Sequence, residues 1–461
     1  MLIADKWSTL WFVAPELQSR NLNLPAGMRD LMGFFSDLIR RVTRSLDGID
    51  HGLTGNIRVF ALRDALLLTA QGLNGGLSVI YTLTVLGANA VDVGLLGSVN
   101  AFVSIFFVLA GGWMGDRYNR KKVFLLGTAI TALNPLVYAF APSWEYLFLA
   151  NIAAPIGGAL ANPVGFSIRA SSVELRSLVR ATATLYTIHA IVNMIVPPIG
   201  AVLVTLLGGL ESLRMIYLME AVVTGVAWLY TAKRLQINHA STELTGIVQA
   251  RPSPRQFLSD LRETYCISRR EGTWMFLLLS ATGPWAFNID GNFQTVYANN
   301  VCQSSLVTIG FLSSVNAFVS MLLFIPIANL AERKGRMNAV IMIRPIQYLG
   351  ILLYILSGTF FVTGVTPYIP LLVWGLRTAG GVAGPGWEVA SIENMPIGRF
   401  STWNALQSFT SSAFGALAPL VGGLLWEIDP RMPFIWHLAV DSVLRYNIMR
   451  RIAKTQKQKS K

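Results

Sequence analysis

The sequence has little charge and almost no cysteine. Asp, Glu, Lys and Arg make up 13% of its 461 residues, and 53% are hydrophobic, which is too apolar for a soluble globular protein. The two cysteines, Cys266 and Cys302, provide no disulfide framework, and neither they nor the four histidines have the spacing of a metal site. There is also no phosphate-binding Gly-x-x-x-x-Gly-Lys-Ser/Thr loop. We therefore expect no enzyme, no cofactor, no bound metal and no ATP-driven pump.

Long apolar runs separated by short basic loops dominate the chain. A helix needs roughly 20 residues to cross a bilayer, and twelve runs near that length predict spans at 59–84, 92–114, 122–141, 145–168, 180–208, 213–232, 273–299, 307–330, 338–363, 367–391, 402–426 and 432–449. The twelfth is the weakest, because His437, Asp441 and Arg445 interrupt it. The pattern predicts an all-α membrane protein in contact with the lipid bilayer.

The basic residues fall in alternate loops. One set of loops holds most of the Lys and Arg, whereas the opposite set holds only Arg214 and Arg431. Because basic loops stay on the cytoplasmic side, both termini are expected there, in a multi-pass protein of the plasma membrane. The net charge of +13 is explained by these loops, so we expect no nucleic-acid binding.

The second and eighth runs contain the same sequence. SVNAFVS at 98–104 recurs at 314–320, and we call the alignment of these two segments the repeat register. The repeat register also aligns the charged residues that follow each run, which are Asp116 with Glu332, Arg117 with Arg333, and Arg120 with Arg336. An internal repeat of this length indicates that the chain consists of two homologous halves.

The repeat and the charge pattern divide the chain into five parts. We predict two six-helix bundles, 56–232 and 273–450, related by a pseudo-twofold axis with a crevice between them. A cytoplasmic linker, 233–272, joins them, and a basic cytoplasmic tail, 451–461, follows. The extension 1–55 contains an amphipathic helix, and three interpretations of it stay open: packing on the cytoplasmic face, lying in the lipid interface, or docking a partner.

One loop carries a specific motif. Residues 112–121 read Gly-Trp-Met-Gly-Asp-Arg-Tyr-Asn-Arg-Lys, which resembles the Gly-x-x-x-Asp-Arg-x-Gly-Arg-Lys signature of the major facilitator superfamily. Asn119 replaces the second glycine, and asparagine also tolerates a positive φ. The chain therefore resembles a major facilitator transporter from Asn56 to about Arg450. The resemblance implies twelve transmembrane helices in two pseudo-symmetric six-helix bundles.

The charged residues around this motif are candidates for a cytoplasmic gate. A glycine allows two helices to approach closely, an aspartate accepts from free N–H groups at a helix start, and arginines pair with acids on adjoining helices. The resemblance also implies a charge relay after the fourth and tenth helices. We assign gating to Gly112, Asp116, Arg117, Arg120, Glu332, Arg333, Arg336, Glu174, Arg180, Glu393 and Arg399. The alternative is that these charges only fix the topology.

The resemblance implies that the first, fourth, seventh and tenth helices line the crevice. Asp290 and Arg377 fall near the middle of the seventh and tenth spans, where an ionisable group is costly unless it pairs or faces water. Two interpretations stay open, a structural ion pair and a substrate or proton site. Asn74 takes the place of Asp290 in the first half, and Gln71, Asn74 and Tyr81 are the uncharged candidates for the site.

Other polar residues inside the spans are less specific. His189, near the middle of the fifth span, either packs in the core or handles substrate or protons. Arg344 and Glu388 lie at similar depths near the cytoplasmic end, and we expect a structural or gating pair. Glu220 in the sixth span is interpreted as structural.

The leading hypothesis is a monomeric secondary transporter of a small solute, with or without proton coupling, that works by alternating access. The rival is a membrane receptor or scaffold on a transporter fold that no longer transports. The arginine and glutamine of proton-coupled drug antiporters are absent, because Asn151 and Ala154 stand at their positions in the fourth span. Import, export and substrate are not readable from the sequence.

Overall fold

Helices form the regular structure of this computed structural model, and no strand occurs among the described residues, which are 55–172, 175–236, 254–358, 364–382, 387, 390–391, 393–395 and 400–459. The first half contains α4 (Gly55–Gly72), α5 (Ser78–Thr84), α6 (Ala90–Arg117), α7 (Arg120–Thr131), α8 (Leu133–Phe140), α9 (Leu147–Ser171), α10 (Leu175–Leu206) and α11 (Leu213–Arg234). The second half contains α13 (Trp274–Gly291), α14 (Gln294–Asn300), α15 (Leu306–Lys334), α16 (Arg336–Ser357), α17 (Ile369–Gly381), α19 (Phe400–Gly415), α20 (Ala418–Ile428), α21 (Met432–Ala439) and α22 (Tyr446–Lys459).

Eight helical stretches of the described residues are long and apolar enough to cross a bilayer. They correspond to the predicted second to sixth, eighth, ninth and eleventh spans. The other four predicted spans are broken, carry more polar residues or continue outside the described residues. A multi-pass membrane protein is confirmed, and the count of twelve helices stays a prediction.

The internal repeat is visible in the helix boundaries. In the repeat register, the start of α5 aligns with the start of α14, and the start of α6 aligns with the start of α15. The helix caps repeat as well, because Asn89 accepts from the backbone of Asp92 at the start of α6 and Ser305 accepts from the backbone of Thr308 at the start of α15. These side chains satisfy N–H groups that have no partner within their helix.

The first helix of each half is interrupted at the same register. α4 and α5 are separated by residues 73–77, and α13 and α14 by residues 292–293. In the first half Gly75 and Gly76 have φ of +43° and +84°, which residues with a Cβ rarely adopt and which cannot continue an α-helix. Interrupted helices of this kind expose backbone groups near the centre of a transporter.

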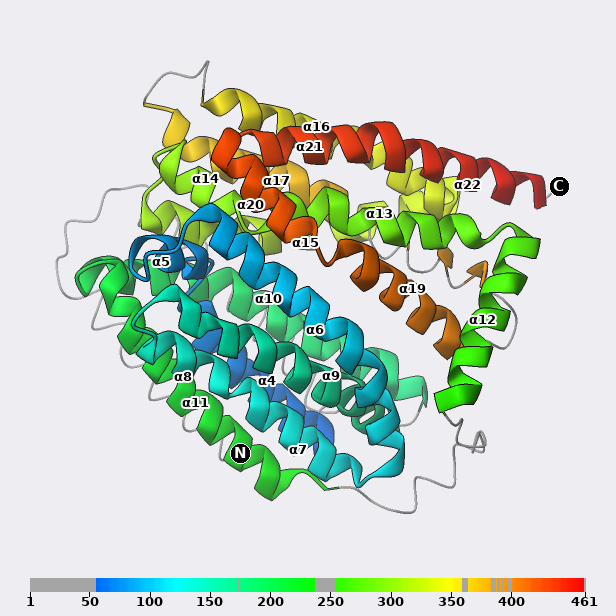
Figure 1. Cartoon of the computed structure of the whole chain (residues 1–461), viewed down its shortest axis with the longest axis horizontal. Coiled ribbons are helices and arrows are strands. Elements are labelled where there is room, and N and C mark those ends of the chain that lie inside the picture. Colours follow the sequence, from blue (N-terminus) through cyan, green and yellow to red (C-terminus); the bar gives the residue numbers. More distant parts are fainter. Residues whose placement is uncertain are drawn as a thin grey trace. The chain divides into compact units, whose positions relative to one another are not determined.

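The two halves repeat their internal packing. α6 packs against α9 in the first half, as α15 packs against α17 in the second, and α7 packs against α9 as α16 packs against α17. Figure 1 shows α4 to α11 grouped in one part of the bundle and α13 to α22 in the other, with α6 at the boundary. Between the halves α6 packs against α20, and α10 packs against α15.

Backbones of the two halves touch at one end of the bundle. A Cβ at Gly423 in α20 would lie 2.5 Å from the carbonyl oxygen of Ala90 at the start of α6. A Cβ at Gly310 in α15 would lie 2.8 Å from the carbonyl oxygen of Pro197 in α10. Both contacts lie far along the helices from Arg117 and the signature loop, so the end opposite that loop is closed.

The segment predicted as the linker contains one helix among its described residues. α12 (Pro254–Glu271) runs at a steep angle to its neighbours in Figure 1. Gly55–Lys461 forms one compact unit, and its division into two six-helix domains stays a prediction. The predicted extension 1–55, apart from its last residue, lies outside the described residues.

Candidate functional site

A cavity of about 390 Å³ lies between the two halves. Its polar lining from the first half includes Ser78, Thr82, Asn100, Tyr138 and Asn151, and from the second half Asn288 and Asn292. No acidic or basic side chain of the described residues is part of this lining. The cavity therefore offers amides and hydroxyls, which both donate and accept hydrogen bonds, and no counterion from the described part of the chain.

The interrupted helices supply this cavity. Ser78 begins α5, directly after the break in the first helix, while Gly291 ends α13 and Asn292 lies in the break of the seventh helix. Pro419 in α20 closes the lining on the side of α6, where Gly97 approaches it. Matching breaks in the two halves thus meet at one chamber.

Asp290 and Arg377 are brought together behind the wall of this cavity. The Asp290 Oδ2 atom lies 2.8 Å from Arg377 Nη1 and 3.0 Å from His437 Nδ1, and the side chains of Asp290 and His437 are fully buried. The contact with Arg377 is an ion pair by distance and that with His437 is a polar contact, although the angles of neither are those of aligned hydrogen bonds. The ion pair was one of the two interpretations from the sequence, and His437 is a third member that neither included.

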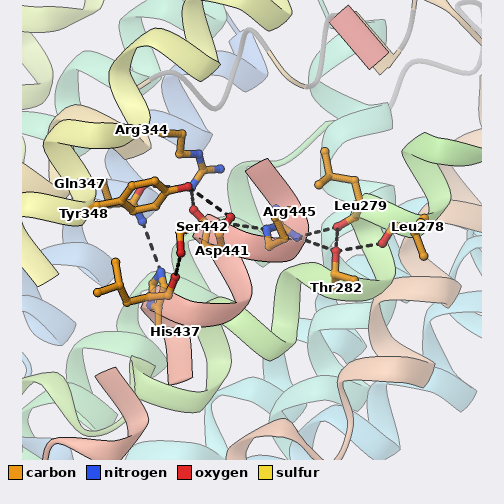
Figure 2. A network of polar contacts seen from close by, with 11 residues as sticks. Leu278, Leu279, Thr282, Arg344, Gln347, Tyr348, His437, Asp441, Ser442 and Arg445 are labelled. Atoms are coloured by element: carbon orange, nitrogen blue, oxygen red, sulfur yellow. Dashed lines mark hydrogen bonds and ion pairs between the residues drawn. The ribbon is translucent and has the colours of Figure 1, made fainter. Parts of the chain in front are cut away.

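A second buried carboxylate lies one helical turn after His437 in the last span. Asp441 is fully buried, and its oxygens accept from Arg344 Nη1 at 3.0 Å and from Arg445 Nε at 2.8 Å. Figure 2 shows Asp441 between these two guanidinium groups, with Tyr348 donating to its backbone carbonyl. Asp441 and Arg445 belong to a π-helical segment, Val440–Arg445, and such segments are frequent at functional sites.

Two residues join the Asp441 cluster to Asp290 and to the cavity. Gln347 accepts from Arg344 at 3.0 Å and lies 3.5 Å from His437 Nε2. The Phe287 ring, which lines the cavity, lies under the guanidinium groups of Arg445 and Arg344 at 5.1 and 5.5 Å. A continuous set of polar and cation–π contacts therefore connects the cavity wall with the last helix.

The uncharged candidates of the first half separate into two groups. Gln71 and Asn74 line a second cavity of about 460 Å³ between α4, α7, α8, α9 and α11, together with Glu220. Asn74 Nδ2 donates to Glu220 Oε2 at 3.1 Å. Tyr81 is fully buried, donates to the Tyr138 carbonyl at 3.2 Å, and is not among the lining residues of either cavity.

His189 has a carboxylate partner that the sequence analysis did not consider. Its Nε2 lies 3.4 Å from Asp64 Oδ2, and Arg63 donates to the other Asp64 oxygen at 2.7 Å. Arg169 lies 3.9 Å from the same carboxylate. The group is an ion cluster between α4, α9 and α10, and of its members only Arg63 lines one of the two cavities.

Part of the predicted gate lies within the described residues. Arg336 Nη2 contacts Glu393 Oε1 at 2.9 Å, and both had been assigned to the gate. Glu332 and Arg333 are exposed at the end of α15, and Arg120 is half-buried at the start of α7. Glu174, Glu388 and Arg399 lie outside the described residues, as do the side chains of Asp116, Arg117 and Arg180 and the surroundings of Gly112.

Asn119 does not adopt the positive φ of the glycine that it replaces, because it caps α7 with φ of −58° and accepts from Lys122 N. Arg344 pairs with Asp441, and its predicted pair with Glu388, which lies outside the described residues, stays a prediction. Asp441 and His437 had been noted only as interruptions of an apolar span, and their charge in that span was the signal that could have identified them.

The sequence profile of the Major Facilitator Superfamily matches residues 65–419. The chain belongs to this superfamily. The match covers most of both halves, in agreement with the repeated helix starts and the signature loop.

Curated relatives match shorter stretches. The uncharacterized MFS-type transporter EfpA of Mycobacterium tuberculosis is 30% identical over 83 residues, which cover 18% of this chain and 16% of that protein. Dipeptide and tripeptide permease A of Serratia proteamaculans is 34% identical over 93 residues, or 19% and 18% of the two chains. The methylenomycin A resistance protein of Bacillus subtilis is 29% identical over 140 residues, or 30% and 28%. The matched stretches span less than a third of each relative.

Solved transporter structures share the fold over most of the chain. The nucleoside transporter NupG aligns with a TM-score of 0.64 at 14% identity, covering 87% of this chain and 98% of that one. A bacterial homologue of the iron transporter ferroportin, in an inward-facing state, aligns with a TM-score of 0.65 at 15% identity, covering 86% and 98%. At this level of identity the likeness establishes the major facilitator fold and leaves the substrate open.

Proposed function

We propose that the protein is a secondary transporter that moves a small, uncharged polar solute by alternating access of the cavity between its two halves. The observation that carries this proposal is the cavity lining, in which hydrogen-bonding side chains from both halves face one chamber. A solute held by both halves can pass from one side of the membrane to the other when the halves rock about it.

The lining argues for the class of solute. Asn100, Asn151, Asn288 and Asn292 present amides that donate and accept. A charged solute in this position would lose its hydration without gaining an opposite charge, and burying an unpaired charge is strongly unfavourable. A neutral solute that carries hydroxyl, carbonyl or amide groups satisfies the asparagines at no such cost.

We assign Asp290 and Arg377 a positioning role behind the cavity wall. Asn288 and Gly291, on either side of Asp290 in α13, line the cavity, whereas Asp290 itself is fully buried. An ion pair to α17 and a contact to His437 in α21 would hold α13 in the geometry that presents Asn288 and Asn292 to the solute. The alternative of direct proton binding at Asp290 remains a second interpretation and is tested below.

The gate is proposed to act at the end of the bundle that carries the signature loop. Backbone contacts such as Gly423 with Ala90 hold the opposite end, which supports an opening of the cavity toward the loop. If the basic loops lie on the cytoplasmic side, as proposed, this state would be inward-facing. Arg336 with Glu393 and the residues around Asp116 would exchange partners when that side closes.

The test combines a binding screen with cavity variants. Purified protein is screened by thermal shift against a library of neutral and charged solutes, and the hits are measured in proteoliposome uptake. Asn292→Ala and Asn151→Ala should lose the shift and the uptake of the same hit, because each removes a hydrogen-bonding amide from one half. Asn338→Ala, an exposed asparagine outside both cavities, is the matched control and should behave like the parent.

Two results would contradict the proposal. If charged solutes alone stabilise the protein, the assignment of a neutral solute is wrong. If no hit is transported and the cavity variants change nothing, the receptor or scaffold hypothesis takes its place.

A further inference from the structure

The second cavity, inside the first half, differs in charge from the cavity between the halves. It measures about 460 Å³, and its lining includes the Glu220 carboxylate and three aromatic side chains, Tyr138, Tyr217 and Trp228. We propose that this cavity, which adjoins the cavity between the halves at Ser78 and Tyr138, is a second binding site that takes an organic ammonium ion, with Glu220 as its counterion. The proposal concerns binding and does not depend on the transport of a neutral solute.

Glu220 is a buried carboxylate with a free position for a cation. It is 6% exposed in α11, and within the described part of the chain its contact is the hydrogen bond from Asn74, a neutral donor. One amide leaves most of the acceptor capacity of a carboxylate unused. A buried carboxylate is strongly unfavourable unless it is paired or protonated. A cationic group in the cavity would therefore provide the counterion that these residues do not.

Tyr217 provides a second and independent indication of a ligand. Its side chain is 3% exposed, it lines the cavity, and its hydroxyl has no hydrogen-bond partner among the described residues. Tyr217 precedes Glu220 by three residues in one helix, so the two side chains lie on the same face of α11. A buried hydroxyl without a partner is unfavourable, and an N–H group of an ammonium ion beside Glu220 would satisfy it.

The aromatic lining favours an organic cation over a metal ion. The Tyr138 and Tyr217 rings lie 5.0 Å apart by their centroids, and the Trp228 indole is held by a 2.9 Å hydrogen bond to the Leu125 carbonyl. Aromatic faces attract ammonium groups, whereas hard metal ions need several oxygen ligands. One carboxylate and a few hydroxyls do not provide such a set.

The positive charge that also lines this cavity is neutralised and distant. Arg63 pairs with Asp64 at 2.7 Å. It precedes Asn74 by eleven residues in the first span, which corresponds to roughly 16 Å along a helix. The end of the cavity near Glu220 therefore has a net negative character, and a ligand with an ammonium group at one end and a neutral or apolar body fits the arrangement.

The experiment compares two probes of the same shape. Benzylammonium and benzyl alcohol are titrated into the purified full-length protein, and binding is measured by saturation-transfer NMR and calorimetry. Glu220→Gln should weaken benzylammonium binding by roughly tenfold or more, because the counterion and a charge-assisted hydrogen bond are both lost, while the weaker binding of benzyl alcohol should change little. Tyr217→Phe should weaken benzylammonium binding by a smaller factor.

Two controls make the outcome decisive. Glu211→Gln removes an exposed carboxylate of the same half and should leave both affinities at the parent value. Asn292→Ala alters the cavity between the halves and should leave the affinity for benzylammonium unchanged. If Glu220→Gln binds benzylammonium as the parent does, or if Asn292→Ala is the variant that loses it, the proposed site is wrong. A parent protein that binds no benzylammonium, with Glu220 holding only a proton, would equally overturn it.

Discussion

Asp290 in α13 and Arg377 in α17 form an ion pair across 2.8 Å, with the Asp290 side chain fully buried. In the repeat register, Asn74 aligns with Asp290. The two residues have corresponding contacts: Asn74 donates a hydrogen bond to Glu220 in the sixth span, and Asp290 contacts His437 in the twelfth. The two halves thus retain one polar contact in the same place, with different charges. The first half therefore has a neutral amide where the second half has a buried carboxylate.

The Asp290–Arg377 pair allows a test of structure against function. Removing one partner leaves the other charge buried and unpaired, which costs about 3–5 kcal/mol of unfolding free energy, whereas removing both can be nearly neutral. Asp290→Asn and Arg377→Gln should each lower the melting temperature, and the double variant should recover most of it. If the pair positions α13, the double variant should also recover transport, with an unchanged pH profile. A stable double variant that does not transport would favour a solute or proton site instead.

We expect Asp441 to contribute strongly to the free energy of unfolding, although it lies in the weakest of the apolar runs. Asp441→Asn leaves two buried guanidinium groups, Arg344 and Arg445, without their counterion, and should cost about 3–5 kcal/mol of unfolding free energy. Ser442→Ala is the matched control, because the Ser442 hydroxyl only donates to the Leu438 carbonyl and its loss should cost about 1 kcal/mol or less. Equal thermal stability of the two variants would show that Asp441 does not hold the network together.

Arg336 and Glu393 should matter for turnover more than for stability. Their side chains are 38% and 51% exposed, and partly exposed pairs contribute about 0–1 kcal/mol. We expect Glu393→Gln to slow uptake while the melting temperature changes little. The exchange of the two residues, Arg336→Glu with Glu393→Arg, should restore part of the rate. A parental uptake rate in Glu393→Gln would remove this pair from the gate.

The loop after α20 contains a pH-dependent contact outside the membrane-spanning segments. Hydrogen bonds from Arg431 lower the pKa of Asp429 to about 2. Because this pKa is below the unfolded value of about 3.9, the stabilisation is fully present above about pH 4 and is lost as the pH falls toward about 2. Asp429→Asn should lower the melting temperature slightly at neutral pH, and by less as the pH decreases below about 4. A difference that grows at low pH would contradict the assignment.

The sequence was sufficient to predict a helical membrane protein with an internal repeat, because repeats and apolar runs are local signals. The repeat register predicted the matching helix starts of α6 and α15, and an ion pair was one of the two interpretations of the isolated charges of Asp290 and Arg377. Family membership is confirmed by the profile match over 65–419.

The partners inside the bundle were harder to predict. Glu220 and His437 lie in the last span of each half, and only packing shows that they contact the first span of the same half. Glu220 was interpreted as structural because the resemblance places the sixth span at the periphery of the fold, and nothing in the sequence indicates the cavity beside it. The π-helical segment at Asp441 was also not predictable, since the extra residue per turn leaves no trace in the apolar pattern.

The most direct test of the account is to lock the two halves together at their closed end. The backbone N of Leu420 donates to Ser98 Oγ at 3.1 Å between α20 and α6, so the two positions are neighbours across the halves, and Ser98→Cys with Leu420→Cys is the pair to be oxidised. The background carries Cys266→Ser, because Cys266 is exposed and Cys302 is buried. As a control, Ser357→Cys faces the native Cys302, whose sulfur lies 3.3 Å from the Ser357 hydroxyl within the second half.

Uptake of the solute identified by the screen is then measured in proteoliposomes before oxidation, after it, and after reduction. Alternating access predicts that the disulfide between the halves abolishes uptake and that reduction restores it, while the control disulfide leaves uptake unchanged. A fully oxidised Ser98→Cys/Leu420→Cys protein that transports at the parental rate would contradict the proposal that the halves move against each other.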